Sequence, residues 1–377
     1  MTVGVAVLGS TGSIGSSTLE VLARQRDRFR VVALTAHSNA ELLERQAADW
    51  KPAYVGLVNS GTGEGGRGRG RGPECLVEAA THPEVRIVVN GIVGAAGLEA
   101  TLAALRAGKR VALANKETLV MAGELVTQAA RDGGGEIVPV DSEHSAVLQC
   151  VTGRGPTELA RLILTASGGP FRTWALERVA DATVEEALRH PTWKMGRKIT
   201  VDSATLVNKA LEVIEAHFLF GLAFAAVDVV VHPQSVVHAF VEFVDGSVLA
   251  QVGFPTMELP ILYALTHPAR VPDAGARRFD PVAAGALTFE PVRAELYPAY
   301  ALGRAAGEAG GTAPAAFNAA NEVAVQLFLE GTIRFGGIAQ TIDRVLAAHR
   351  PAAARTLAAV LAADAEARRL AREAACS

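Results

Sequence analysis

The chain opens with a strand, a glycine-rich turn and a helix, and this order constrains its fold more than any other feature. Val3–Leu8 is a short apolar run, Gly9, Gly12 and Gly15 follow at three-residue spacing, and Ser16–Arg24 has the composition of a helix. Glycines with this spacing let the backbone approach a pyrophosphate, and the start of the helix supplies N–H donors. The pattern favours a dinucleotide site over a tight strand–helix turn without a ligand.

Apolar runs alternate with helical stretches through the first 150 residues. The expected helices are 98–107 and 118–131, and the further expected strands are 30–35, 53–58, 85–90, 110–114 and 136–140. Buried runs that alternate with helices are typical of a mostly parallel, doubly wound sheet. The expected fold class is therefore α/β, with an N-terminal Rossmann-like doubly wound parallel sheet.

The remainder of the chain predicts two further parts. Strand-like runs that return through the tight turn Asp245-Gly246 indicate an antiparallel or mixed sheet, and hence an α+β catalytic domain. Pro314 suits a first helical turn and Gly331 suits a helix end, which predicts a C-terminal helical bundle. The expected boundaries are 1–150 for the dinucleotide-binding domain, 151–285 for the catalytic domain, and 286–377 for a linker and the helical domain.

Charge and cysteine content argue against several classes of protein. Thirty-six basic and 39 acidic residues give a net charge of −3, which does not suit a nucleic-acid binder. The three cysteines are scattered, so they indicate neither a disulfide framework nor a thiolate metal site, and they fit a reducing compartment. The sequence carries no signal peptide and no apolar stretch long enough to span a bilayer. We expect a cytoplasmic protein without a membrane or nucleic-acid partner.

The run 61–72 is composed almost entirely of glycine and arginine. Such a composition cannot repay the entropy of ordering the backbone. The run is therefore predicted to be a mobile surface loop, which is favoured over an arginine contact with an anion.

Two carboxylates follow the expected strand 136–140. Asp141 and Glu143 are two residues apart, so in an extended segment their side chains share one face. Oxygen ligands of this kind suit a hard divalent cation. The alternative is that these residues cap a helix over 142–151, and the local sequence favours this capping role.

The end of the second strand indicates which dinucleotide binds. An NAD site usually has an acidic residue there for the ribose 2′-hydroxyl, whereas this chain has the sequence Thr-Ala-His-Ser-Asn over residues 35–39. His37, Ser38 and Asn39 can donate hydrogen bonds to a 2′-phosphate. The sequence therefore favours NADPH over NADH.

Two further segments carry polar groups. Lys116 follows the strand 110–114, at the edge where ligands of doubly wound sheets bind, and surface charge is its alternative role. Asp202-Ser203 is expected to cap a helix that runs to about Phe220. On that helix Asn208 and Glu212 stack at i,i+4 beside Lys209, opposite an apolar stripe. These side chains offer two phosphate-binding groups and a third carboxylate.

Taken in order, these segments resemble the 1-deoxy-D-xylulose 5-phosphate reductoisomerase family. The resemblance covers nearly the whole chain, and its matching segments are 9–15, 114–117, 140–144, 167–171, 190–196, 201–205, 208–212 and 232–238. Ala210 stands where many members have glycine, and the run 61–72 has no family motif to align with.

The resemblance implies a fold, an activity and a set of site residues. It implies NADPH- and metal-dependent rearrangement and reduction of 1-deoxy-D-xylulose 5-phosphate to 2-C-methyl-D-erythritol 4-phosphate, in non-mevalonate isoprenoid precursor biosynthesis. The metal would be Mg²⁺ or Mn²⁺, with Co²⁺ as an alternative, held by Asp141, Glu143 and Glu212. These three and Lys116 would be catalytic. The phosphorylated sugar would be bound by Lys116, Ser142, Glu143, Ser167, His190, Trp193, Ser203, Asn208, Lys209 and Glu212.

The resemblance also implies the cofactor contacts and the assembly. NADPH would be held by Gly9, Thr11, Gly12, Ser13, Ile14, His37, Ser38, Asn39, Asn115, Glu117 and Gly196. Trp193 and Met195 would lie in a mobile lid, and the enzyme would be an oxidoreductase that forms a homodimer. Two alternatives are a metal-free NADP-dependent dehydrogenase of another small phosphorylated substrate and a non-catalytic dinucleotide-binding regulator.

Overall fold

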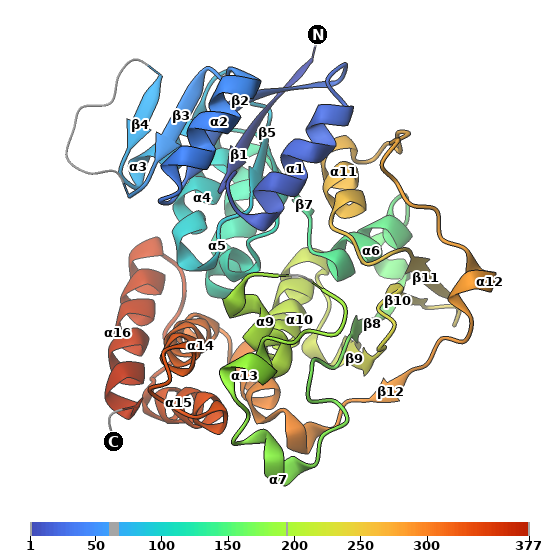
Figure 1. Cartoon of the computed structure of the whole chain (residues 1–377), viewed down its shortest axis with the longest axis vertical. Coiled ribbons are helices and arrows are strands. Elements are labelled where there is room, and N and C mark those ends of the chain that lie inside the picture. The colour runs from blue at the N-terminus through green and yellow to red at the C-terminus, as the bar shows by residue number, and fades with distance from the viewer. Residues whose placement is uncertain (1, 60–67, 194, 376–377) are drawn as a thin grey trace. The chain divides into compact units, whose positions relative to one another are not determined.

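The computed structural model describes residues 2–59, 68–193 and 195–375 (Figure 1). The chain divides into two compact units. Unit 1 comprises residues 1–118, 126–145 and 256–277, and unit 2 comprises residues 119–125, 146–255 and 278–377. The domain boundaries expected at residues 150 and 285 stay predictions.

Unit 1 is built on a parallel sheet, which has seven strands in the described residues. The strands are β1 (Val3–Leu8), β2 (Phe29–Ala36), β3 (Tyr54–Leu57), β4 (Arg69–Arg71), β5 (Ile87–Asn90), β6 (Arg110–Leu113) and β7 (Glu136–Pro139). Their spatial order is β4-β3-β2-β1-β5-β6-β7. The chain therefore winds outward from β1 in both directions, which confirms the predicted doubly wound sheet. Ligands of such sheets bind at the carboxyl ends of the strands where the winding reverses, here β1 and β5.

Helices cover both faces of this sheet. They are α1 (Ser13–Arg24), α2 (Ala40–Trp50), α3 (Glu74–Thr81), the 3-10 turn η1 (Gly94–Gly97), α4 (Leu98–Arg106), α5 (Lys116–Gly133), α6 (Ser142–Val151) and α11 (Glu258–Thr266), of which α5 and α6 extend into unit 2. Right-handed crossovers that run in opposite directions place α1 and α2 on one face and α3 and α4 on the other. Helix α11 comes from much later in the chain and packs on α1, where Arg24 pairs with Glu258 at 2.5 Å and with Asp273 at 2.6 Å.

Part of the glycine/arginine-rich run is ordered, contrary to the prediction of a loop. Residues 69–71 form β4, which pairs in parallel with β3 at the edge of the sheet. The ladder provides hydrogen-bond partners for this short backbone segment. Gly70 is required there because a Cβ atom would lie 1.7 Å from the Tyr54 hydroxyl. Residues 61–67 of the predicted loop lie outside the described residues.

Unit 2 contains a mixed sheet, five-stranded in the described residues. Its strands are β8 (Leu159–Ala166), β9 (Val227–Val231), β10 (Val237–Phe243), β11 (Val248–Val252) and β12 (Glu290–Pro291). Their spatial order is β11-β10-β8-β9-β12. Strand β10 is antiparallel to both of its neighbours, and β8 and β9 are parallel. The turn between β10 and β11 is the predicted Asp245-Gly246, where Gly246 has a φ of 83°. The α+β class of this part is confirmed.

The other elements of unit 2 are helices, and the last of them form the C-terminal bundle. They are α7 (Leu176–Val179), α8 (Val184–Ala187), α9 (Arg197–Ala204), α10 (Val207–Phe220), α12 (Pro281–Ala284), α13 (Pro298–Ala309), α14 (Ala313–Leu329), α15 (Phe335–Ala348) and α16 (Leu357–Ala375), with 3-10 turns η2 (Pro156–Glu158), η3 (Phe224–Ala226) and η4 (Ala294–Leu296). Helix α14 packs against both α15 and α16, and Figure 1 shows these three helices together at the orange and red end of the chain. The bundle and its helix signals at Pro314 and Gly331 are confirmed.

One helix boundary was predicted wrongly. Asp202 and Ser203 do not cap the helix that ends at Phe220, because they lie near the end of the separate helix α9. Leu206 follows with a φ of 53°, a left-handed conformation that ends α9 and redirects the chain into α10. Lys209 and Glu212, which lie opposite the apolar stripe of α10, are buried as well.

Candidate active site

The glycine turn has the geometry of a pyrophosphate cradle. Gly9 has a φ of 78°, and the Gly12 N–H donates to the Gly9 carbonyl at 3.0 Å. A Cβ atom on Gly15 would lie 2.3 Å from that same carbonyl oxygen, so only glycine allows α1 to start so close to β1. The N-cap of α1 is Gly12, which has no side chain to accept a hydrogen bond from the first N–H groups of the helix. The turn therefore fits an anionic ligand.

The three residues after β2 are exposed, but one of them is partly engaged. Asn39 is the N-cap of α2, and its Oδ1 accepts a hydrogen bond from the Leu42 N–H at 3.1 Å. His37 and Ser38 are exposed beside it. Asn39 therefore offers a ligand only its Nδ2 group.

Asn115 and Glu117, two of the predicted cofactor residues, are buried between β6 and α5. The Asn115 amide donates to the Ile92 carbonyl at 2.7 Å and to the Gly94 carbonyl at 2.9 Å. Asn115 thus fastens the loop that follows β5. That loop follows one of the two strands at which the winding reverses, so the hydrogen bonds shape the edge where a dinucleotide is expected.

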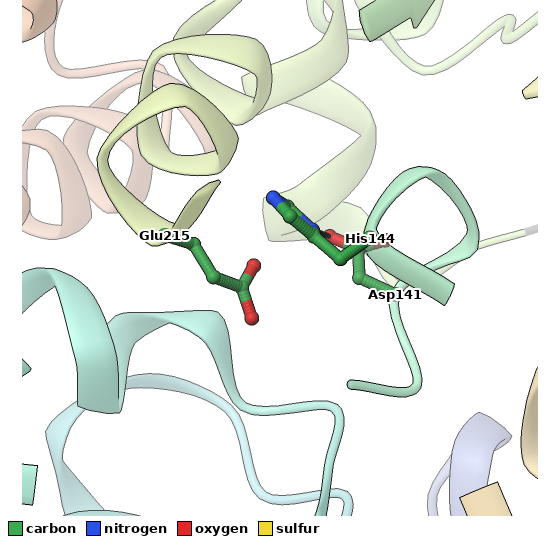
Figure 2. Close-up of side chains that lie close together, drawn as sticks. All are labelled: Asp141, His144 and Glu215. Carbon is green, nitrogen blue, oxygen red and sulfur yellow. Dashed lines mark ion pairs between the residues drawn. The ribbon is translucent and has the colours of Figure 1, made fainter. Parts of the chain in front are cut away.

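Lys116 and Asp141 form a buried ion pair at the carboxyl ends of β6 and β7. Lys116 is 5% exposed, and its ammonium group contacts Asp141 Oδ2. The pair arises because β6 and β7 are neighbours in the sheet, so the residues that follow them meet at one edge. His144 lies one turn further along, with its Nδ1 at 3.8 Å from Asp141 Oδ2. Figure 2 shows Asp141 and His144 beside each other at the start of α6 and also draws Glu215 of α10.

Asp141 and Glu143 lie at the start of a helix. The extended conformation that was expected to put their side chains on one face is therefore absent. Asp141 Oδ1 accepts from the Ser142 N–H at 3.0 Å, and the Ser142 hydroxyl donates to Glu143 Oε2 at 2.6 Å. The predicted helix over 142–151 is present as α6. The contact of Asp141 with the N–H of Ser142 leaves its other oxygen for Lys116, so a helix-start role and a ligand role are compatible.

Helix α10 supplies a second polar cluster, which lies wholly in unit 2. Lys209 forms an ion pair with Glu212 Oε2, and the Asn208 amide donates to Glu212 Oε1. Lys209 is 3% exposed and Glu212 is fully buried. Burying charges is costly even when they are paired, so a cluster of this kind indicates a functional site more strongly than a contribution to stability.

His190 lies within hydrogen-bonding distance of two serine hydroxyl groups, both of which were predicted to bind the substrate. Its Nε2 lies 3.0 Å from Ser167 Oγ and 3.1 Å from Ser203 Oγ. Its Nδ1 accepts hydrogen bonds from the backbone N–H groups of Thr192 and Trp193, at 3.1 and 2.9 Å. Because Nδ1 is an acceptor, the proton of the neutral ring lies on Nε2. The ring therefore donates toward the two serines, and the serine hydroxyl protons are available to a ligand.

The environment of His190 leads to a first prediction. Burial lowers the pKa of His190 from 6.5 to about 4, so the ring is neutral at physiological pH. In an NMR titration its Cε1 proton signal is expected to stay unchanged from about pH 8 to about pH 5.5. Since the folded pKa lies below the unfolded one, this group makes the protein less stable as the pH falls from 6.5 toward 4. A midpoint near 6.5 would contradict this assignment, and His190→Gln identifies the signal.

Tyr297 is a neighbour of the site that sequence reasoning missed. Its hydroxyl donates to the Gly168 carbonyl at 2.8 Å, and the residue is 2% exposed. Gly168 and Gly169 have φ values of 80° and 64°, so the turn that carries Ser167 has a backbone conformation reserved largely for glycine. The two partners are 129 residues apart, and no local pattern predicts their contact.

A second prediction concerns this anchor. Tyr297→Phe removes one buried hydrogen bond and leaves the Gly168 carbonyl without its donor, which is expected to cost about 1–3 kcal/mol of unfolding free energy. Thermal or denaturant unfolding measures this loss. Tyr300→Phe is the matched control, because Tyr300 lies on α13 near the same segment and is only half-buried. Equal stability of the two variants would show that the Tyr297 hydroxyl does not hold the turn.

Asp202, which was wrongly predicted to cap a helix, instead makes contacts within unit 2. It is 1% exposed, it accepts a hydrogen bond from Asn321 of α14 at 2.8 Å, and it pairs with Lys198 at 2.8 Å. These contacts tie α9, which carries Ser203, to the C-terminal bundle. The sequence indicated a polar helix start at Asp202 but gave no sign of its distant partner.

Comparison with models of protein families identifies the family to which the chain belongs. The 1-deoxy-D-xylulose 5-phosphate reductoisomerase model matches residues 5–123, and two models of C-terminal domains of that enzyme match residues 137–220 and 252–370. The chain belongs to the 1-deoxy-D-xylulose 5-phosphate reductoisomerase family. Reductoisomerases from Symbiobacterium thermophilum and Geobacter sp. are each 50% identical to it, and each alignment covers 98% of both chains.

Solved structures of reductoisomerases have the same fold as the chain. The enzyme from Zymomonas mobilis, solved in complex with NADPH, has a TM-score of 0.91 and 41% identity, with full coverage of both chains. A reductoisomerase solved with NADPH, fosmidomycin and magnesium has a TM-score of 0.92 and 38% identity, and the match covers 99% of this chain and 98% of that one. These matches confirm the predicted family and fold class. In the part of the chain that the structure describes, no helix is long and apolar enough to cross a membrane.

Proposed function

We propose that the chain is an NADPH- and divalent-metal-dependent oxidoreductase that rearranges and reduces 1-deoxy-D-xylulose 5-phosphate to 2-C-methyl-D-erythritol 4-phosphate. The observation that carries this proposal is the 50% identity to reductoisomerases over 98% of both chains. The product is a precursor in non-mevalonate isoprenoid biosynthesis, and the expected compartment is the cytoplasm. The clusters in the two units supply the chemistry that the reaction requires.

Asp141, Glu143 and Glu212 are the proposed ligands of Mg²⁺ or Mn²⁺. Their carboxylate oxygens are the donor set that hard divalent cations prefer, and magnesium is named in the structure of a related reductoisomerase. Lys116 pairs with the partly buried Asp141 and Lys209 pairs with the buried Glu212, so the charges of both carboxylates are already compensated. When bound, the cation supplies Lewis acidity to the two neighbouring oxygens of a hydroxyketone, and NADPH supplies the reducing electrons.

The phosphate of the substrate is assigned to the cluster around His190 and Lys209. Ser167, Ser203 and Asn208 supply uncharged donors, and Lys209 supplies the positive charge. Neutral His190 orients the two serines through its Nε2 proton. Binding energy gained at the phosphate, away from the reacting carbons, holds the substrate for the rearrangement. Trp193 and Met195, both half-buried on the loop before α9, are proposed to close over the site and exclude water.

The dinucleotide is assigned to the glycine turn and the residues near it. The Gly9–Gly15 turn fits the pyrophosphate because Gly12 caps α1 without a side chain and leaves the first N–H groups of the helix to a ligand. Thr11, Gly12, Ser13 and Ile14 lie along this turn, and each is at least partly exposed. Gly196, the exposed N-cap of α9 in unit 2, is also proposed to contact the dinucleotide. Asn115 and Glu117 are proposed to contact the dinucleotide at the sheet edge, next to the loop that follows β5.

The proposed activity has a direct test. Purified protein is expected to consume NADPH when 1-deoxy-D-xylulose 5-phosphate is added, and EDTA is expected to abolish this consumption until Mg²⁺ or Mn²⁺ is restored. NADPH consumption that persists in EDTA would favour a metal-free dehydrogenase. Specific binding of NADPH without turnover of any phosphorylated sugar would favour a dinucleotide-binding regulator.

A third prediction separates substrate binding from chemistry. Lys209→Ala removes the positive charge assigned to the phosphate and is expected to raise the substrate KM about ten- to a hundredfold, with a smaller change in kcat. The KM for NADPH should stay the same. Steady-state kinetics at saturating metal measure these values, and Lys198→Ala is the comparison because Lys198 pairs with Asp202 and is not assigned to the phosphate. An unchanged substrate KM in Lys209→Ala would count against the phosphate assignment.

The assembly is proposed to be a homodimer. Strand β11 is the edge of the unit 2 sheet, and its side chains Val248, Leu249 and Val252 are 50%, 41% and 37% exposed. An uncovered apolar edge strand is a surface at which a second chain adds. Light scattering coupled to gel filtration should give twice the mass of the chain, and a monomer at micromolar concentration would reject the dimer.

A further inference from the structure

The strand formed by the glycine/arginine-rich run borders a cavity of unit 1. The cavity has a volume of about 340 Å³ and lies among α2, β3 and β4. Its polar lining consists of Ser38, Glu44, Asn59, Arg69 and Arg71. Ser38 directly follows the end of β2, where the adenosine ribose of a dinucleotide lies in sheets of this kind. The cavity thus adjoins the position expected for the ribose 2′ substituent.

We propose that Arg71 binds the 2′-phosphate of NADPH and thereby determines the preference for NADPH over NADH. The inference rests on the proposed function, which makes NADPH the cofactor. It goes beyond the resemblance because the run 61–72 matched no family motif. It gives β4 a role that the sequence left open.

The strand register places Arg71 level with the end of β2. Ala36 of β2 is paired with Leu57 of β3, and Leu57 is paired with Arg71 of β4. Neighbouring strands are about 4.8 Å apart, so two strand spacings, about 10 Å, separate the Arg71 backbone from the end of β2. An extended arginine side chain and a phosphate group together span that distance.

The direction of the Arg71 side chain follows from that of Arg69. Arg69 pairs with Glu44 of α2 through both prongs of its guanidinium, and Nη2 lies 2.9 Å from Glu44 Oε2. Side chains two residues apart on a strand project to the same face. Arg71 therefore lies on the α2 face as well, one pair nearer the carboxyl edge and nearer Ser38 and Asn59.

The charges of the cavity suit a phosphate. Glu44, the acidic residue in the lining, is engaged by Arg69, and this contact lowers the pKa of the Glu44 carboxyl. Arg69 thereby offsets a negative charge that would repel the ligand, while Arg71 contributes a further positive charge. The Ser38 hydroxyl and the Asn39 Nδ2 group, whose Oδ1 caps a helix, are uncharged donors. Charge-assisted bonds from arginine to phosphate are stronger than such contacts.

Binding of adenosine fragments to the full chain tests the proposal without turnover. Isothermal titration of 2′,5′-ADP and 5′-AMP compares ligands that differ only in the 2′-phosphate. Arg71→Ala is expected to raise the Kd for 2′,5′-ADP by about ten- to a hundredfold, and to change the Kd for 5′-AMP by less than about twofold. Arg71→Lys keeps the charge and should recover part of the loss. Arg30→Ala is the matched control, because Arg30 lies near the opposite end of β2 and pairs with Glu84.

The outcomes separate this inference from the proposed function. An unchanged Kd for 2′,5′-ADP in Arg71→Ala, or an equal loss for both fragments, overturns the 2′-phosphate contact. Arg71 is exposed, so the variant should melt with the wild type. If the wild type binds 2′,5′-ADP through Arg71 but does not turn over 1-deoxy-D-xylulose 5-phosphate, the proposed activity fails and this contact stands. If the wild type is an active reductoisomerase and Arg71→Ala keeps its ratio of NADPH to NADH kcat/KM, only the inference fails.

Discussion

Glu212→Gln is expected to lower turnover by about a hundred- to a thousandfold, because it would remove one of the three carboxylates proposed to hold a cation, whose Lewis acidity would supply several kcal/mol of transition-state stabilisation. The substitution keeps the volume of the side chain, and its amide can still contact neighbours. Affinity for Mn²⁺, measured by paramagnetic resonance on the protein without substrate, should fall in parallel. Activity equal to that of the wild type at ordinary Mg²⁺ would reject Glu212 as a ligand.

The control for this variant must separate lost metal binding from lost folding. Glu212 is fully buried and pairs with Lys209, so the single variant removes a negative charge that compensates the Lys209 ammonium group in the interior. The double variant Glu212→Gln/Lys209→Met removes both charges and should regain thermal stability without regaining Mn²⁺ affinity. Glu308→Gln, at an exposed glutamate of α13, should change neither property.

Lys116→Met is expected to lower kcat by about a hundredfold, as the loss of a preorganised charge beside reacting oxygens typically does. Methionine keeps most of the apolar stem, so the packing around this 5% exposed side chain is retained. The KM for NADPH should change by less than about twofold, since Lys116 pairs with Asp141 and is proposed to act on the substrate. Rapid-quench or stopped-flow measurement of a single turnover would locate the loss in the chemical steps.

Lys109 provides the matched control for Lys116. It is also a buried lysine, it directly precedes β6 at the opposite end of that strand, and its ammonium group donates to the His82 carbonyl at 2.5 Å. Lys109→Met should lower stability and leave kcat close to that of the wild type. Equal losses of kcat in the two variants would mean that Lys116 acts through folding alone.

The sequence predicted the fold best where local pattern and tertiary environment agree. The run Val3–Leu8 became β1 with the predicted bounds, because an apolar run between breakers has few alternatives in a buried sheet. A capping box at Thr183 is equally local, since Thr183 and Glu186, three residues apart, exchange hydrogen bonds at 3.2 and 2.9 Å. In both cases the residues that determine the structure are adjacent in the chain.

The predictions failed where the deciding partner is distant or the backbone departs from its usual range. Residues 69–71 became a strand because β3 was available to pair with them, which composition does not reveal. The break at Leu206 depends on a positive φ that leucine rarely adopts. Helix α11 joins unit 1 although it follows β8 to β11 of unit 2 in the chain, and nothing within Glu258–Thr266 indicates which core it enters.

The candidate site could be predicted as a set of residue types but not as a set of contacts. The carboxylates, the serines and the lysines were all found from motifs and spacing. The neutral state of His190 could not be, because it depends on backbone N–H groups that point at Nδ1. The burial of Lys209 and Glu212 could not be predicted either, since an amphipathic pattern suggests that polar residues face water.

The hydrogen bond from Asn321 to Asp202 has a consequence for how sequence variation would be interpreted. In a saturation screen in which growth depends on the activity of this protein, positions that do not tolerate substitution should extend into α14, beyond the residues proposed to hold the sugar phosphate. Replacing Asn321 with leucine would leave the bundle helical and would loosen α9, on which Ser203 sits. A map of intolerance drawn on the chain would therefore outline a larger functional unit than a map of ligand contacts.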